Sequence, residues 1–339
     1  MKQVIRKGKP EMIKPICFDD CKLYYKVYGG AEKKECIIYN GEVYMLKFRA
    51  SSENKGNISS PYVNNVYSEY LGSTICNLLG YPAQKTLYGT YRGKEVVACR
   101  DFCNDYPEFI LYEFNKFKAS SLSLGSSGSN DGTELEEILD TINTHRMIND
   151  KPLALSKFWD MFVVDAFIGN FDRHNGNWGF LINPKENDSI FAPIFDCGSS
   201  LYSRLTDNEM EKILKSEEEI RKRVYDKPTS ALKYGNGRIK YYDFLSAGEF
   251  DDCNRALKGL VEKDFNSVYD FISNCGFLSS VRKEFYLTIL KARKELLLNR
   301  AYRNISKNNT LDQKLDKARN LAGRQEGVRI EKRTLEEIH

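Results

Sequence analysis

The segment from Ile168 to Leu181 reads "IGNFDRHNGNWGFL", and residues 192–201 continue with "APIFDCGSSL". Its polar part follows the run "FWDMFVVDAFI", which is apolar on almost every side, as in a helix buried inside a protein. Gly169 suits the C-terminal cap of that helix, so residues 170–177 are predicted to form an exposed loop. Two strands are predicted next, at 178–182 and 190–195, joined by a turn at 184–189.

Three polar side chains are expected to meet at the open end of this hairpin. The residue before the first strand of an antiparallel hairpin and the residue after the second lie at the same end, which places Asn177 and Asp196 beside Asp172. Mg²⁺ prefers oxygen ligands, usually one or two carboxylates completed by water and phosphate. Phosphoryl transfer also needs a carboxylate that orients the attacking hydroxyl and accepts its proton. The trio therefore fits phosphoryl transfer.

The spacing supports this chemistry. In protein kinases the aspartate of the catalytic loop precedes a metal-binding asparagine by five positions, and a later D-x-G supplies another ligand. Asp172 precedes Asn177 by five, and Asp196 begins D-C-G. Either motif alone is weak evidence for a kinase site, since about one D-x₄-N is expected by chance in a chain this long. The order and the hairpin between them carry the argument. A purely structural alternative makes these residues loop caps, Arg173 a surface ion-pair partner and His174 a brace, and for His174 we favour that scaffold role.

A lysine for phosphate binding can be sought independently. In "VYMLKF" (43–48), the period of two places Lys47 on the same strand face as Val43 and Met45. A lysine on an apolar face needs an anion, which ATP phosphates would provide, with Glu69 of "SEYLG" steadying the amine. The alternatives are a lysine at a strand end that reaches solvent and a glutamate on a helix surface.

The chain is predicted to have an α+β, bilobal fold. A hairpin at Asn40-Gly41, a helix over 62–80 and strands on both sides of Arg92-Gly93 indicate a small β-rich N-lobe at residues 1–103. Helical patterns dominate residues 104–309, which we interpret as a larger C-lobe. Residues 310–339 are expected to form a polar, basic helical tail, since residues 291–339 carry 13 Lys or Arg against 7 Asp or Glu.

Composition excludes several classes of protein. The 339 residues are 41% hydrophobic and 12% aromatic, which is typical of a folded chain. Nine scattered cysteines argue against a disulfide framework, and three histidines against a histidine-rich metal site. The net charge of +4 is too small to indicate a nucleic-acid partner. Without an apolar leader or an 18-residue apolar run we expect no membrane partner and a cytoplasmic location, while export by a non-classical route stays open.

Taken together, the motifs resemble those of the HipA-like serine/threonine kinases, in particular the compact CtkA type without the usual amino-terminal extension. The resemblance rests on "GNFDRHNGNWGF", "APIFDCGSSL", "EVYMLKF", "SEYLGSTICNLLG" and "VVACRDF" and covers most of residues 20–300. It implies a protein-kinase-like fold related to HipA and phosphoinositide kinases, ATP with Mg²⁺, and Ser/Thr protein substrates. An antitoxin or host partner is not identified by the sequence. The resemblance makes Asp172 the catalytic base, and Asn177 and Asp196 the metal ligands.

The resemblance assigns further residues by analogy. Gly29 and Gly30 of "YGGAEKK" would cover the phosphates, and Cys99, Arg100 and Phe102 would connect the lobes beside adenine. Kinases of this type are autophosphorylated in a serine-bearing loop. The flexible, serine-rich segment 120–132 offers the candidate acceptors Ser120, Ser121, Ser123, Ser126, Ser127 and Ser129.

Two other functions remain open at this point. The same D-R-H-x-x-N and D-x-G arrangement resembles phosphoinositide kinases, although a lipid headgroup favours a basic surface near the D-x-G. The segment 197–213 has the basic residues Arg204 and Lys212 but also several acids, which disfavours a lipid kinase. The second alternative is an inactive module that binds ATP as a structural ligand. Such a module is expected to lack a catalytic position, and this chain lacks none.

Overall fold

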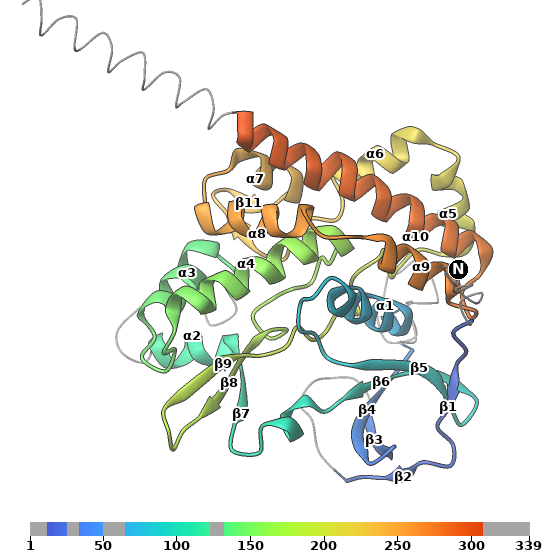
Figure 1. Cartoon of the computed structure of the whole chain (residues 1–339), viewed down its shortest axis with the longest axis horizontal. Helices are drawn as coiled ribbons and strands as arrows, with labels where there is room; N and C mark the ends of the chain where they lie inside the picture. Colours follow the sequence, from blue (N-terminus) through green and yellow to red (C-terminus); the bar gives the residue numbers. More distant parts are fainter. Residues whose placement is uncertain (1–11, 26–33, 50–64, 123–131, 308–339) are drawn as a thin grey trace, which may run out of the picture.

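The computed structural model of the chain describes residues 12–25, 34–49, 65–122 and 132–307. An N-terminal six-stranded sheet has the order β1-β5-β6-β4-β3-β2. Its strands are β1 Ile16–Cys17, β2 Lys22–Leu23, β3 Lys34–Tyr39, β4 Glu42–Phe48, β5 Thr86–Tyr91 and β6 Lys94–Arg100. Helix α1, Asn65–Leu78, packs on β5 and β6 (Figure 1).

Two tight turns order this sheet. Asn40 and Gly41 both have positive φ angles, 49° and 78°, as a type I′ turn between antiparallel strands requires. Arg92 and Gly93 repeat the pattern between β5 and β6, at 49° and 71°. Both predicted hairpins are therefore confirmed.

Strand β4 separates two apolar clusters, as its period of two predicts. Tyr44 and Leu46 are buried in a cluster on one face with Phe18 and Val96. Met45 is buried in the main core on the other face, together with α1. Lys47 shares the register of Met45 and therefore points toward α1 rather than to solvent.

The rest of the chain is mostly helical. A 3₁₀ turn, η2 Phe102–Asp105, leads from β6 to a three-stranded sheet of order β7-β8-β9, formed by β7 Ile110–Glu113, β8 Gly179–Asn183 and β9 Asp188–Phe191. The helices are α2 Phe114–Leu122, α3 Leu135–Thr144, α4 Lys151–Ile168, α5 Asp207–Leu214, α6 Glu217–Tyr225, α7 Tyr241–Ala247, α8 Asp251–Val261, α9 Asn266–Asn274 and α10 Ser280–Ala292, which continues into η3 Arg293–Asn299. A short hairpin joins β10 Lys233–Tyr234 to β11 Gly237–Arg238.

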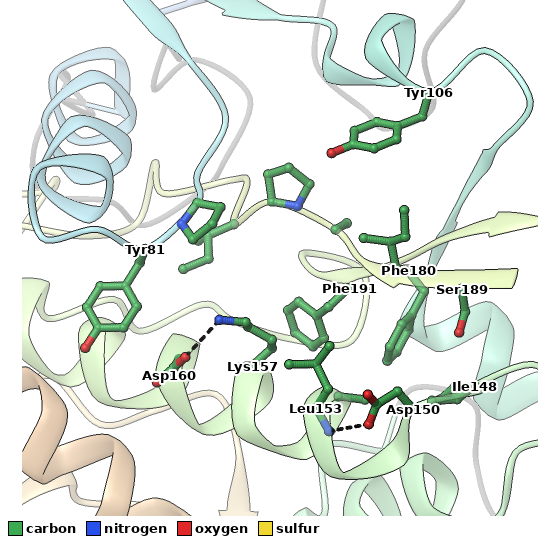
Figure 2. Close-up of a pocket in the computed structure, with 16 residues that line it drawn as sticks. Tyr81, Tyr106, Ile148, Asp150, Leu153, Lys157, Asp160, Phe180, Ser189 and Phe191 are labelled. Carbon is green, nitrogen blue, oxygen red and sulfur yellow. Dashed lines mark hydrogen bonds and ion pairs between the residues drawn. The ribbon is translucent and has the colours of Figure 1, made fainter.

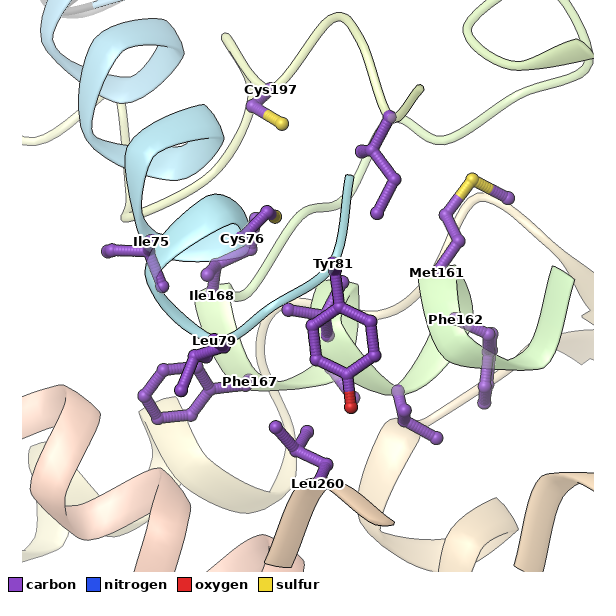
Figure 3. Close-up of a cluster of buried hydrophobic side chains, with 14 of the residues drawn as sticks. Ile75, Cys76, Leu79, Tyr81, Met161, Phe162, Phe167, Ile168, Cys197 and Leu260 are labelled. Carbon is purple, nitrogen blue, oxygen red and sulfur yellow. The ribbon is translucent and has the colours of Figure 1, made fainter. Parts of the chain in front are cut away.

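Helix α4 lies at the centre of the helical part and packs against α8, α3 and α1 (Figures 1 and 3). From Met161 to Ile168 every side chain is buried, which confirms the prediction of a helix buried on all sides. Figure 3 shows Ile75, Cys76 and Leu79 at the end of α1 facing Phe167 and Ile168 of α4. This contact joins the N-terminal sheet to the helical part.

A second contact joins the two parts through aromatic rings. Phe277, between α9 and α10, stacks on Tyr88 of β5 with ring centroids 4.0 Å apart. The rings of Tyr67 and Tyr70 on α1 lie 6.0 and 5.8 Å from Phe277. Glu95 of β6 accepts hydrogen bonds of 2.6 Å from both the Tyr67 and the Tyr88 hydroxyl. Helix α1 is therefore held from the sheet side and from the helical side.

The predicted fold class, a sheet-rich N-terminal part followed by a helical part, is confirmed. One predicted strand is wrong at its end: the run 190–195 leaves β9 after Phe191, because Ile194 pairs with Pro82 and Gln84 instead. The lobe boundaries at 103 and 309 stay a prediction, and the proposed tail 310–339 lies outside the described residues. All nine cysteines lie in the described part of the chain, and none of them forms a disulfide. None of the described helices combines the length and the apolar character that a membrane span requires.

Candidate active site

A buried acid near the end of α4 organises the loop after it. Asp165 is only 1% exposed, and its carboxylate is therefore buried in a helix whose neighbouring residues are apolar. Gly169 ends the helix in the left-handed conformation, with φ 66°, and its N–H donates to the Asp165 carbonyl. The chain then turns back, which brings residues 170–173 toward the Asp165 carboxylate. The predicted cap at Gly169 is confirmed.

Arg173 is the partner of that carboxylate and is 2% exposed. Its Nε and Nη2 donate to the two oxygens of Asp165 at 2.8 and 3.1 Å. Burial alone would lower the pKa of Arg173, but the Asp165 carboxylate overcomes that effect and holds the pKa well above its usual value. A surface ion pair at Arg173 was one structural alternative; the structure shows a buried one.

The same guanidinium reaches the segment that carries Asp196. Its Nη1 donates to the Asn177 carbonyl at 2.7 Å, to the Phe195 carbonyl, and more weakly to the Asp196 carbonyl at 3.4 Å. One side chain thus fixes the backbone of the loop 170–177 against the backbone of the D-x-G segment. These bonds hold the Asn177 and Asp196 backbones together, and the joint action of Asp172, Asn177 and Asp196 stays a prediction.

Asn170 and Asn177 set the conformation of the loop around Asp172. The Asn170 amide donates to Asp165 at 3.0 Å, and its oxygen accepts from the Asp172 N–H at 3.2 Å. The Asn177 amide nitrogen donates to the Asp172 carbonyl at 2.8 Å, so its oxygen is the atom left for a cation. Within the described part of the chain the Asp172 carboxylate has no hydrogen-bond or ion-pair partner, which leaves it available to a substrate hydroxyl.

A charged triad lies across from this loop. The Lys47 amine is 3.1 Å from Asp196 Oδ1 and 3.4 Å from Glu69 Oε1, and Glu69 is 1% exposed. Burial would lower the pKa of Lys47, yet the carboxylates of Glu69 and Asp196 raise it well above its usual value, so the amine is charged. Burial likewise works against ionisation of Asp196, but Lys47 outweighs it and keeps that pKa below the usual value. Burial raises the pKa of Glu69, against the opposing effect of Lys47.

Two glycines allow this close approach. A Cβ at Gly72 of α1 would lie 2.8 Å from both Cys197 Cβ and Ser200 Oγ. A Cβ at Gly198 would lie 3.1 Å from Glu69 Oε2. Asp196 itself has a φ of 58°, a conformation that non-glycine residues adopt infrequently and that is enriched at functional sites. Helix α1 and the D-x-G segment are therefore packed backbone to backbone.

The geometry has the features of a site for a nucleotide and a divalent cation. Lys47 offers a positive charge beside Asp196, and Asn177 and Asp196 offer side-chain oxygens on two segments that Arg173 ties together. Among the described residues, no group of three or more His, Cys, Asp or Glu side chains is arranged to hold a metal alone. Two protein ligands suit Mg²⁺ in phosphoryl transfer, where water and phosphate complete the coordination.

The connection between the two parts runs from Cys99 and Arg100 at the end of β6 to Phe102, and the polar groups of Arg100 already bond within the protein. The Arg100 N–H donates to Lys85, its carbonyl accepts from Gln84 at 2.9 Å, and its guanidinium pairs with Glu42 and Asp105. Contact between the Arg100 backbone and adenine would require some of these bonds to be exchanged.

Two other positions of the connection are apolar. Cys99 is buried in the main core. Phe102 forms an apolar cluster with Leu181 and Ala192, beside Phe195. The assignment of Cys99, Arg100 and Phe102 to nucleotide binding stays a prediction.

Several predicted positions lie outside the described residues: Gly29, Gly30, Ser123, Ser126, Ser127 and Ser129. Ser120 and Ser121 belong to the end of α2, whose side chains there are not described. The His174 N–H donates to the Asp172 carbonyl at 2.8 Å, and its Nδ1 accepts from the Gly176 N–H at 3.0 Å, which agrees with a scaffold role.

Sequence reasoning missed Asp165 and Asn170 and undervalued Arg173. The available signal was a lone acid inside the apolar run "FVVDAFI", followed eight residues later by an arginine. A charge in a helix buried on all sides requires a partner, and the nearest following cation was Arg173.

The chain is similar to known proteins in sequence and in fold. No protein-family model matches it. The serine/threonine-protein kinase CtkA of Helicobacter pylori (strain J99) is 40% identical over 280 residues, which make up 82% of this chain and 84% of that protein.

Solved structures agree with this likeness. The crystal structure of a Helicobacter pylori proinflammatory kinase CtkA has a TM-score of 0.78 and 38% identity, and the match covers 86% of this chain and 99% of that one. HipA of Shewanella oneidensis MR-1, solved with HipB and operator DNA, has a TM-score of 0.51 and 14% identity over 87% of this chain and 70% of that one. The second match bears on the fold alone.

Gly72→Ala tests the close packing of α1 on the D-x-G segment. Helix propensity favours alanine by about 1 kcal/mol, but the new methyl group must displace Cys197 or Ser200. We expect a loss of about 1–3 kcal/mol in the free energy of unfolding, measured in urea, together with weaker ATP binding. Gly259→Ala on α8 is the matched control, because a Cβ there meets nothing within 4 Å. Gly259→Ala should raise the free energy of unfolding. If Gly72→Ala raised it too, the close packing at Gly72 would be contradicted.

Arg173→Lys tests the guanidinium as a link between two segments. Lysine keeps the charge, but its single ammonium cannot reach Asp165 and the carbonyls beyond it together. Turnover at saturating ATP is expected to fall by at least about tenfold, with a stability loss of about 1–3 kcal/mol from carbonyls left without a donor. The exposed substitution Arg221→Lys should leave turnover unchanged and should alter the free energy of unfolding by no more than about 0.5 kcal/mol. Wild-type turnover in Arg173→Lys would show that the link is dispensable.

Proposed function

The chain belongs to the serine/threonine-protein kinase family of CtkA, and from this membership we propose that it transfers the γ-phosphoryl group of ATP to protein serine or threonine hydroxyls with the help of Mg²⁺. The observation that carries the proposal is the Lys47 amine held between Glu69 and Asp196 at 3.4 and 3.1 Å. These three residues come from β4, α1 and the D-x-G segment, and their meeting is what phosphate binding requires.

Asp172 is proposed as the base. Its carboxylate stands on a loop fixed by Asn170 and Arg173, and it would orient the acceptor hydroxyl and take its proton. The hydroxyl oxygen forms a bond to the γ-phosphorus as the bond to the β,γ-bridging oxygen breaks, and ADP leaves. The protein contributes position and charge to this step.

Mg²⁺, when bound, would neutralise charge on the phosphates, and the Asn177 amide oxygen and the Asp196 carboxylate are proposed to hold it. The lowered pKa of Asp196 supports this role, because the ligand must be ionised. Lys47 would contact the phosphates, with Glu69 keeping the amine in place. Gly29 and Gly30 are proposed to cover the phosphates and Phe102 to contact adenine, with Cys99 and Arg100 beside it.

Protein substrates are favoured over lipids, because the relative that matches over most of the chain is a protein kinase. Retention of Lys47, Asp172, Asn177 and Asp196 in one constellation disfavours an inactive module. The cytoplasmic location remains a prediction, as do the identities of the substrate and of any antitoxin or host partner.

Autophosphorylation is proposed for the serine-rich segment that precedes Gly132. The Gly132 carbonyl accepts hydrogen bonds of 2.8 Å from the Asn175 amide and from Lys118. Asn175 belongs to the loop between Asp172 and Asn177. The described end of the serine-rich segment is thus tied to the proposed catalytic loop, which supports access of its serines to the same site.

Asp172 and Asp196 are expected to act together in phosphoryl transfer. Asp172→Asn and Asp196→Asn should each lower transfer of labelled phosphate to a basic acceptor protein by about 10³-fold or more, and the double variant should be little worse, because the residues act as one unit. Asp243→Asn, on the exposed side of α7, is the control and should leave the rate unchanged. Near wild-type transfer by either single variant would refute the assignment. A rate seen only with phosphoinositide vesicles would favour the lipid kinase.

The serine-rich segment is expected to be autophosphorylated. Incubation with ATP and Mg²⁺ should place phosphate on at least one of Ser120, Ser121, Ser123, Ser126, Ser127 and Ser129. Each phosphate adds about −1.5 to −2 charges near a site that binds ATP, so activity is expected to fall as it accumulates. Mass spectrometry locates the phosphate. Phosphate only at other positions, or none in an active enzyme, rejects this proposal.

A further inference from the structure

A pocket of about 290 Å³ lies between α4, the β8–β9 hairpin and the segment that follows α1 (Figure 2). Its walls are the first half of α4, strand β9 with residues 192–194, and the Tyr81-Pro82 segment between α1 and β5. None of its lining residues is Lys47, Glu69, Asp172, Asn177 or Asp196. The pocket is therefore distinct from the nucleotide site.

The lining is mostly apolar and aromatic. Phe180 and Phe191 form one wall, and Tyr106 faces them across the opening (Figure 2). Leu153 stands at the rim, where 51% of its surface is exposed. Pockets that bind small molecules have volumes of about 300–1,000 Å³ and a hydrophobic lining with a few placed polar groups. This pocket lies at the lower limit of that range and has such a lining.

The polar groups of the pocket are acidic in balance. Asp150 and Asp160 line it with one cation, Lys157, whose amine lies 3.4 Å from Asp160. Burial raises the pKa of Asp160, although Lys157 and the more distant Lys263 oppose the change. The existing cations thus do not compensate fully for the burial of this carboxylate, and a further positive charge in the pocket would be favourable.

The walls connect the pocket to the site residues. The Ile194 N–H donates to the Pro82 carbonyl, and its own carbonyl accepts from the Gln84 N–H, both at 2.8 Å. Ile194 lies two residues before Asp196. Tyr81 and Pro82 follow α1, which carries Glu69. A molecule between these walls would therefore brace the segments that bring Asp196 to α1.

We propose that this pocket is a regulatory site for a small molecule with an apolar, ring-sized body and one protonated amine, and that its occupancy raises the affinity of the protein for ATP. The pocket is open in the arrangement in which Lys47 contacts both Glu69 and Asp196, so a ligand that fills it favours that arrangement. Binding of the amine stands on the pocket alone. Only its coupling to ATP rests on the proposed kinase function.

Tryptamine is the probe, and indolepropionate, with the same ring and chain length but a carboxylate, is its matched control. Calorimetry on the full chain without nucleotide should give a low-millimolar or tighter dissociation constant for tryptamine, as expected for a ligand of about 12 non-hydrogen atoms. Indolepropionate should bind at least about tenfold more weakly, because it meets the Asp150 and Asp160 carboxylates.

Two variants locate the binding. Asp160→Asn should abolish most of the preference for the amine, while Asp140→Asn on the exposed face of α3 should leave it intact. The Asp160→Asn variant is expected to fold, because burial already disfavours the charged carboxylate there. Leu153→Ser should weaken both probes, and Ile110→Ser, at a similarly exposed aliphatic residue outside the pocket, should weaken neither.

The coupling is measured by repeating the titration at saturating ATP. Tryptamine should bind at least about fivefold more tightly, and ATP should gain the same factor at saturating tryptamine, since linkage is reciprocal. Weaker tryptamine binding with ATP would place the amine in the nucleotide site and overturn the proposal. Absence of tryptamine binding, equal binding of the two probes, or binding without coupling would also overturn it. A protein that binds tryptamine but no ATP would refute the kinase proposal while leaving the amine site standing.

Discussion

A single buried ion pair determines how the proposed active site is built. Asp165 lies inside an apolar helix, where an unpaired carboxylate would cost several kcal/mol, so its partner Arg173 must be buried with it. Once there, the guanidinium has donors left, and buried donors need acceptors. They reach the carbonyls of Asn177, Phe195 and Asp196. The need to satisfy one buried charge thus sets the distance between the loop that carries Asp172 and the segment that carries Asp196.

The opposite side of the site depends on how closely backbones approach. Helix α1 can bring Glu69 to Lys47 only because Gly72 leaves room for Cys197 and Ser200. The stack of Phe277 on Tyr88, with Tyr67 and Tyr70 alongside, holds α1 from the helical part of the chain. In this arrangement the Lys47–Glu69 and Lys47–Asp196 contacts are present together. The protein's own carboxylates therefore hold the Lys47 charge in position, as electrostatic preorganisation requires.

Local patterns predicted much of this and failed where long-range contacts decide. The period of two in β4 gave the orientation of Lys47, and Gly169 and Asn40-Gly41 gave a helix end and a turn, because these depend on neighbouring residues alone. Strand β9 ends before its apolar run does, since Ile194 finds partners at Pro82 and Gln84, more than a hundred residues away. Hydrophobic periodicity shows which face of a helix or strand a residue is on, but not which residues lie opposite that face. It therefore could not predict the burial of Glu69 or the hydrogen bonds of Arg173.

A crystal structure with Mg²⁺ and a non-hydrolysable ATP analogue would show whether Lys47, Asp172, Asn177 and Asp196 surround one nucleotide–metal complex. We expect a metal ligated by Asp196 and Asn177, phosphate oxygens within hydrogen-bond reach of the Lys47 amine, and the Asp172 carboxylate facing the γ-phosphate. A nucleotide bound elsewhere, or a metal that contacts neither Asp196 nor Asn177, would contradict it.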